Sequence, residues 1–280
     1  MDARASLHAP VDYLLHLADN AVVLGQRNAE WCGHAPTLEE DLALANNSLD
    51  LIGQARLLYQ YAAERLNAEG ARTRPSAWPA GPVTEDTLAY FRDVPDFRNY
   101  TLLELPHSPP LVPAGVGDHD WATTIVRNFL YSALMVLVWQ RLASSADAHL
   151  AAIAAKSLKE VRYHLRHAHD WLVRLGDGTD ASQRRAQAAL DWLLPFTDEF
   201  WSASALESQV ADDATGVQVS ALRAQWDALV DDAIAAATLQ RPAAVPGYVS
   251  QGKQGVHSEH LGYLLSEMQS LARAHPGATW

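Results

Sequence analysis

The sequence predicts an all-α fold: a bundle of long helices with extra helices and one long crossover connection. The composition is 49% hydrophobic and 19% charged, and Ala and Leu recur while clusters of Val, Ile and Thr are scarce, which favours helix over strand. Apolar residues also recur at intervals of three or four, the period of a helix. At 280 residues the chain can bury a full core, and we expect a single domain over residues 1–280.

The first helix is expected to open at Pro10, because proline has no N–H to leave unpaired in a first turn. Its apolar face runs from Val11 to Leu24. Gly25 is expected to weaken its end.

The second helix is expected from Leu38 to Leu66, where apolar residues step by three or four. Thr37 and Glu40 have the spacing of a capping box, in which both side chains bind orphan N–H groups at the helix start. Gly53 lies inside this helix and costs about 1 kcal/mol relative to Ala. Close approach of a neighbouring backbone would explain why it is there.

A connection rich in proline, from Asn67 to Gly117, follows. A short helix is expected at Glu85–Arg92 and an extended stretch at Asn99–Leu105. Two pairs of helices joined by one long crossover is the arrangement of ferritin-like bundles. The sequence therefore predicts a ferritin-like helical bundle.

Six more helices are expected after the crossover, each from the same period. Gly176-Asp177-Gly178 is expected to end the second of them, and Pro195 to kink the third. Their expected ranges are Trp121–Ala143, Ala148–Leu175, Ser182–Phe200, Trp201–Asp213, Val219–Leu239 and Ser258–Ala274.

Charge and cysteine content exclude several classes of function. A formal charge of −12 argues against nucleic acid or an anionic membrane as partner. Cys32 is the only cysteine, so no intramolecular disulfide can form, which suits the cytoplasm; we expect it to be a small packed hydrophobe. Met1–Pro10 lacks the apolar core of a signal peptide. The longest apolar run, Phe129–Trp139, is about half a membrane span and is expected to be a buried helix.

An oxygen-activating di-iron bundle needs a Glu from each of two helices and Glu-x-x-His from each of two others. No Asp or Glu occurs between Asp120 and Asp147, so one long helix offers no carboxylate. The only Glu-x-x-His match, Glu104 with His107, falls among prolines, and we expect an irregular surface segment there. The closest approach in a long helix is Glu160 with His164, which is one residue too long.

We therefore expect a metal-free polar core, the remnant of a metal site, in place of a metal centre. Two stripes of polar residues would face each other there, with opposite charges paired because an unpaired buried charge costs several kcal/mol. Asp50 with Lys156, or Glu160 with an arginine, would be such pairs. The stripes consist of Asn46, Asp50 and Gln54 on one helix and of Lys156, Glu160 and His164 on another.

Two rival interpretations stay open. The chain could be a metal-dependent oxidoreductase in its own right, using Glu160 and His164 together with His257 or His260. His257 and His260 could also suggest zinc, but a third ligand is not evident, and Ser258 as a helix N-cap is the simpler interpretation. A third class is a binding module, in which Lys253, in the loop Gly252–Gly255, contacts the phosphates of coenzyme A or a partner.

Several long strings of residues are similar to one known family. The chain resembles the C subunits of the multicomponent phenylacetyl-CoA 1,2-epoxidase, over nearly its whole length and in order. Asn67–Ala80 and Ser202–Gly216 match least. The strings that carry the resemblance are Leu24–Arg27, Glu30–Pro36, Asp41–Asn46, Leu49–Arg56, Lys159–Arg166, Gly252–Leu261 and Glu267–Gln269.

The resemblance implies a non-catalytic, ferritin-like subunit with no cofactor of its own. Its partner would be a catalytic A subunit that carries the di-iron centre and binds the CoA thioester. A reductase subunit with flavin and an iron–sulfur cluster would deliver electrons from NADPH, and the complex would insert one oxygen atom into the ring of phenylacetyl-CoA. The implied role of this chain is to support the A subunit, with no catalytic residue assigned; a homo-oligomer is also compatible with the resemblance.

Overall fold

The computed structural model describes residues 7–69, 78–108, 119–244 and 249–278, so parts of the predicted crossover, 70–77 and 109–118, lie outside the described residues. In the described part every named element is a helix, and the one β feature is an isolated bridge between Gln251 and Val256. The all-α prediction is therefore confirmed.

The Cα positions divide the chain into two compact units, each made of three segments. The α1 unit comprises Pro10–His34, Asp41–Leu105 and Ser250–Trp280, and the α5 unit comprises Met1–Ala9, Ala35–Glu40 and Pro106–Val249. Neither unit is a continuous stretch of chain, so no single position in the sequence separates the two units. The prediction of one domain over residues 1–280 stays a prediction.

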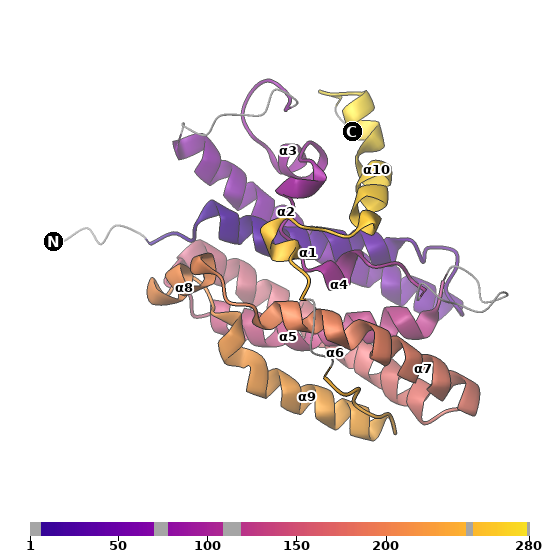
Figure 1. Cartoon of the computed structure of the whole chain (residues 1–280). Coiled ribbons are helices and arrows are strands. Elements are labelled where there is room, and N and C mark those ends of the chain that lie inside the picture. The colour runs from indigo at the N-terminus through magenta and orange to yellow at the C-terminus, as the bar shows by residue number, and fades with distance from the viewer. Residues whose placement is uncertain (1–6, 70–77, 109–118, 245–248, 279–280) are drawn as a thin grey trace. The chain divides into compact units, whose positions relative to one another are not determined.

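The α5 unit is organised around a long apolar helix that packs against several others of the unit (Figure 1). Asp120 and Asp147 cap the first two helices by accepting from backbone N–H groups of the first turn, as helix N-caps do. Pro195 lies in a 3₁₀ segment that replaces the predicted kink, since proline cannot continue the α ladder. The helices are α5 (Trp121–Leu142), α6 (Ala148–Gly176), α7 (Asp180–Leu193), η2 (Leu194–Trp201), α8 (Ala205–Asp212), η3 (Val219–Leu222) and α9 (Arg223–Ala236).

Helix α5 is long and apolar enough to cross a membrane by length and composition, and 94% of its most apolar window is buried inside the protein. Trp226 of α9 donates from its indole N–H to the carbonyl of Leu130 in α5 at 3.0 Å. Burial is what a core helix requires, so the expectation of a buried helix is confirmed.

The α1 unit joins early and late parts of the chain (Figure 1). α1 contacts α4 and α10, and α10 also contacts α3, α4 and η1. Glu104 and its neighbours form a helical turn where an extended stretch was predicted; this was wrong because Leu102, Leu103 and Leu105 are all buried, so no face alternates with solvent. The helices are α1 (Val11–Ala29), α2 (Leu38–Glu69), α3 (Glu85–Tyr90), η1 (Val94–Asp96), α4 (Thr101–Glu104), η4 (Gly252–Gln254) and α10 (Glu259–Ala274).

The close approach predicted at Gly53 is found at Gly25 instead. α1 continues through Gly25 to Ala29, and a Cβ at Gly25 would lie 3.3 Å from the carbonyl oxygen of Ser48 in α2. Gly25, and not Gly53, is therefore where α1 and α2 approach closely. A Cβ at Gly53 would meet nothing within 4 Å, so nothing in the described chain requires glycine there.

Candidate functional site

The stripe predicted on α2 is graded from exposed to buried. Asn46 is exposed, Asp50 is half-buried and Gln54 is 3% exposed. Asn46 therefore does not belong to a buried core, because the three positions turn progressively from the solvent side of α2 toward its packed side. Asp50 and Gln54 remain predicted members.

The stripe predicted on α6 shows the same gradation. The side chain of Lys156 is 61% exposed, that of Glu160 is 21% exposed, and His164 is buried. Lys156 Nζ lies 3.9 Å from Glu160 Oε1, one turn further along the same helix. Exposed pairs of this kind contribute about 0.3–0.5 kcal/mol. Lys156 is thus a surface residue, which corrects its assignment to the core.

Glu104 and His107 are buried, with 0% and 2% exposure, so the predicted surface segment was wrong. In the α5 unit, His107 Nδ1 lies 2.7 Å from Thr124 Oγ1 and 2.9 Å from Arg127 Nη2. A guanidinium can only donate, so the lone pair of that nitrogen accepts from Arg127. This imidazole nitrogen is occupied by protein donors.

The most complete polar cluster of the α1 unit surrounds the Glu104 carboxylate. Oε2 lies 2.8 Å from His257 Nδ1 and accepts from Asn99 Nδ2 at 2.9 Å, and Oε1 accepts from the backbone N–H of Ser258 at 2.5 Å. The side chains of Glu104 and His257 are both fully buried. Arg27 donates to the Glu104 carbonyl at 2.7 Å, so α1, α4 and the start of α10 meet in this cluster.

His257 faces an acceptor on both ring nitrogens, because Nε2 lies 3.0 Å from the carbonyl oxygen of Phe97. Only the imidazolium donates from both nitrogens, so the geometry favours a buried ion pair with Glu104. The Ser258 hydroxyl makes no capping hydrogen bond. The carboxylate of Glu104 binds the helix N-terminus in its place, where negative charge is stabilising. Ser258 is the N-cap residue of α10, as predicted, but its side chain does not accept the capping hydrogen bond.

A second buried ion pair in the α1 unit joins Asp19 of α1 to Arg92. Tyr59 donates to Asp19 Oδ1 at 2.6 Å, and the Arg98 backbone N–H donates to Oδ2 at 2.8 Å. Arg92 and Asp19 are 3% and 0% exposed. Burial alone would lower the pKa of Arg92, but the adjoining Asp19 carboxylate raises it overall. Burial, and then the charge of Asp19, raise the pKa of Tyr59. The phenol therefore stays protonated and donates.

Glu40 was predicted to complete a capping box, and its carboxylate faces α6. Oε2 accepts from Trp171 Nε1 at 2.7 Å and lies 2.8 Å from His167 Nε2. This charged acceptor fixes an indole and an imidazole spaced one turn apart on α6. It is a tie within the α5 unit and presents no vacant oxygen pair to a ligand.

Lys253 lies in η4, and its Nζ is 5.8 Å from the centroid of the Tyr100 ring, within the range of a cation–π contact. The contact is made inside the α1 unit. A role for Lys253 toward coenzyme A phosphates or a partner stays a prediction. Cys32, predicted to be packed, is exposed, because it lies in the turn that follows α1.

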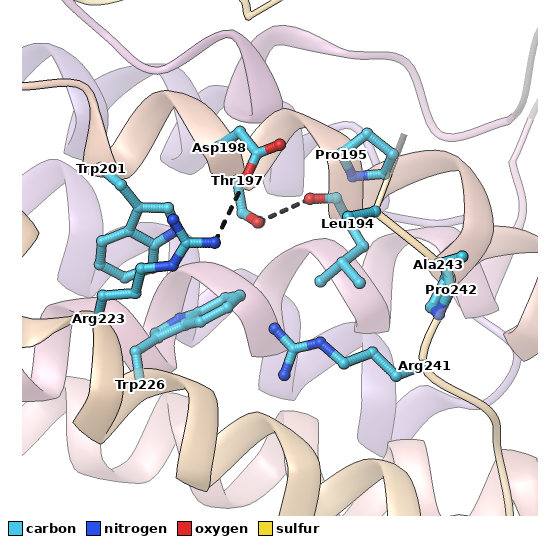
Figure 2. Close-up of a pocket in the computed structure, with 11 residues that line it drawn as sticks. Leu194, Pro195, Thr197, Asp198, Trp201, Arg223, Trp226, Arg241, Pro242 and Ala243 are labelled. Carbon is cyan, nitrogen blue, oxygen red and sulfur yellow. Dashed lines mark hydrogen bonds and ion pairs between the residues drawn. The ribbon is translucent and has the colours of Figure 1, made fainter. Parts of the chain in front are cut away.

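A pocket of about 280 Å³ lies between η2 and α9 in the α5 unit (Figure 2). Trp201 and Trp226 form one wall, and Arg241 enters from the other side. Arg241 is paired with Asp227 at 2.5 Å and Asp231 at 2.6 Å. Its charge is therefore already balanced. Asp198 and Arg223, 4.0 Å apart, also line the pocket, so charged and apolar side chains share its walls.

Within residues 7–69, 78–108, 119–244 and 249–278, the carboxylates do not fit the four-helix ligand pattern of a carboxylate-bridged di-iron centre. Such a centre draws carboxylates from four helices, whereas α5 has none. On α6, Glu160 and His164 are spaced by four and not three. Buried Asp19 and Glu104 and half-buried Glu40 are occupied by protein donors. No chemical step through iron follows from these residues.

The sequence profile of the phenylacetic acid catabolic protein family matches residues 2–280. The chain therefore belongs to this family, whose fold class is all-α and ferritin-like. It is 44% identical over 268 residues to the C subunit of the 1,2-phenylacetyl-CoA epoxidase of Escherichia coli strain K12, and the match covers 96% of this chain and 98% of that protein. The resemblance predicted from the strings of residues is confirmed.

Proposed function

We propose that this chain is a non-catalytic, structural subunit of a phenylacetyl-CoA ring 1,2-epoxidase, which supports the di-iron catalytic A subunit during aerobic phenylacetate catabolism. The observation that carries the proposal is the 44% identity, over 96% of the chain, to the C subunit of such an epoxidase. We expect the complex in the cytoplasm, with a reductase subunit as a further partner and no cofactor in this chain.

The chemistry of the buried carboxylates supports a structural role. A metal ligand needs an oxygen lone pair directed at an open position, with its other contacts in a supporting shell. Both carboxylate oxygens of Glu104 are in hydrogen bonds, with His257, Asn99 and the Ser258 N–H. Both oxygens of Asp19 accept hydrogen bonds, from Arg92, Tyr59 and the Arg98 N–H. Groups bound in this way fix helices relative to one another and leave no coordination position.

Reconstitution tests the proposal. The A subunit and the reductase would be assayed for epoxidation of phenylacetyl-CoA with and without this chain, and co-purification of the chain with the A subunit would be measured in parallel. We expect a stable complex and turnover that depends on the chain. Glu160→Gln and His164→Gln should leave the turnover of each assembled complex unchanged.

The rival function, an oxidoreductase built on Glu160 and His164, gives the opposite result. In that case the two substitutions would abolish turnover while co-purification and melting temperature stayed the same. Absence of any complex between this chain and the A subunit would also contradict the proposal.

A further inference from the structure

One side of α2 exposes apolar side chains. Leu42 and Leu49 are 57% and 66% exposed, and with Gly53 and the exposed Asn46 they define the outward face of α2. Ile52, which is 40% exposed, lies at the edge of this face, because its Cγ1 would lie 3.1 Å from a Cβ at Gly25 of α1. The opposite side of the helix is the packed one, where Leu44, Leu51 and Leu58 are buried, with at most 3% exposure. A helix that is apolar on two sides is normally covered on both, so the outward face is expected to have a partner.

Gly53 belongs to this face because it follows Leu49 by four residues and Leu42 by eleven, about three turns. A Cβ at Gly53 would meet nothing within 4 Å. Glycine inside a helix costs about 1 kcal/mol relative to Ala, and the described chain gains nothing from it. Glycine on a helix surface lets another backbone approach closely. Gly25 does this inside the α1 unit, where a Cβ at Gly25 would lie 3.3 Å from the Ser48 carbonyl oxygen.

The spacing of the apolar side chains fits a helix better than a loop or a sheet. Leu42 and Leu49 are seven residues apart and Ile52 is three further, the pattern of a heptad seam into which another helix packs its side chains. We propose that the outward face of α2 is the docking surface for an apolar helix of the catalytic subunit, with Gly53 at the point of closest approach. This inference rests on the proposed function.

Charge favours a different subunit over a second copy of this chain. Asp41 and Asp50 lie beside the seam, and the first basic residue of the helix is Arg56, whose Nε is 3.4 Å from Glu85. The whole chain carries −12. A second copy would bring the same acids against these, whereas a helix flanked by Lys or Arg would complement them.

Substitutions with matched controls test this surface in the full chain. Gly53→Met fills the proposed approach point, and Leu49→Gln removes an apolar contact. Gly262→Met and Leu271→Gln on α10 are the controls, because a Cβ at Gly262 also meets nothing within 4 Å and Leu271 is 56% exposed. The affinity for the purified catalytic subunit, the melting temperature of the isolated chain and its sedimentation would be measured for each.

We expect Gly53→Met and Leu49→Gln to weaken binding of the catalytic subunit at least about tenfold, or about 1.4 kcal/mol, with a melting temperature no lower than that of wild type and with both controls binding like wild type. Wild-type affinity in both α2 variants would overturn the docking surface while leaving the proposed function intact. Loss of self-association alone would also overturn it, since the occupant would be a second copy. If wild-type chain fails to bind the catalytic subunit, both proposals fall.

Discussion

The two units hold their buried carboxylates in different ways. In the α1 unit, Asp19 and Glu104 are each paired with a buried basic side chain. In the α5 unit, Asp120 and Asp147 lie at helix starts, where they accept from backbone N–H groups; the arginine that pairs with Asp120, Arg185, is exposed. α5 itself contains no carboxylate. The difference lies in the partner of the carboxylate: a buried basic side chain in the α1 unit, and mainly backbone N–H groups in the α5 unit.

The largest effect is expected from breaking an ion pair of the α1 unit. Arg92→Met would leave the Asp19 charge buried without its cation, and removal of one partner of such a pair costs about 3–5 kcal/mol. Denaturant unfolding would measure the loss. Arg56→Met is the control, because its pair with Glu85 is exposed, and it should cost less than about 1 kcal/mol. Equal losses in the two variants would contradict the comparison.

A smaller effect is expected from pH, again in the α1 unit. Burial lowers the pKa of His16 from 6.5 to about 4, and the neutral ring is 2.7 Å from the Arg98 carbonyl oxygen that it donates to. As the pH falls, His16 of the unfolded chain therefore takes up a proton at a higher pH than His16 of the folded chain. The stability that the neutral His16 ring contributes is complete above pH 6.5 and is lost as the pH falls toward 4.

The loss from His16 should reach about 2 kcal/mol near pH 5. His16→Gln should remove this part of the pH dependence between pH 6.5 and 4, as measured by unfolding free energy against pH. His275→Gln, at an exposed position, should retain it. A His16→Gln profile that parallels wild type would show that the imidazole is not held neutral.

The smallest effect is expected at a helix start of the α5 unit. Asp147→Ala removes the acceptor for the His149 and Leu150 N–H groups at 3.0 and 3.1 Å and for the Ala9 N–H at 2.7 Å. Loss of an N-cap costs about 1 kcal/mol, up to about 2. Asp147→Asn retains an acceptor and should cost less. If Asp147→Ala lowered the unfolding free energy as much as Arg92→Met does, the contrast between a buried ion pair in one unit and a helix cap in the other would be contradicted.

The sequence was sufficient for the helices, because their apolar periods are long. It was insufficient for Glu104, which lies in a segment of prolines and was assigned to the surface; its binding partner His257 is 153 residues away in the chain, and no local pattern reports such a pairing. The neighbouring Leu102, Leu103 and Leu105 were the available signal, since three apolar residues around one acid indicate burial.

The prediction of a polar core was also limited, because the helical period alone does not fix which residues of a stripe are buried. Period alone places Asn46 and Gln54 near one side of α2, yet one is exposed and the other buried, because eight residues along a helix drift around its axis. Glycine was informative but ambiguous. The sequence predicted a weak helix end at Gly25 and close approach at Gly53, and only the packing shows that the approach within the chain is made at Gly25.

The central claim is that this chain supports an oxygenase without holding its metal. The most direct measurement is the metal content of each chain after the co-purified complex is separated under conditions that retain bound iron. The account predicts stoichiometric iron with the catalytic subunit and none with this chain. Stoichiometric iron that remains with this chain, and that is lost in Glu160→Gln or His164→Gln, would contradict it.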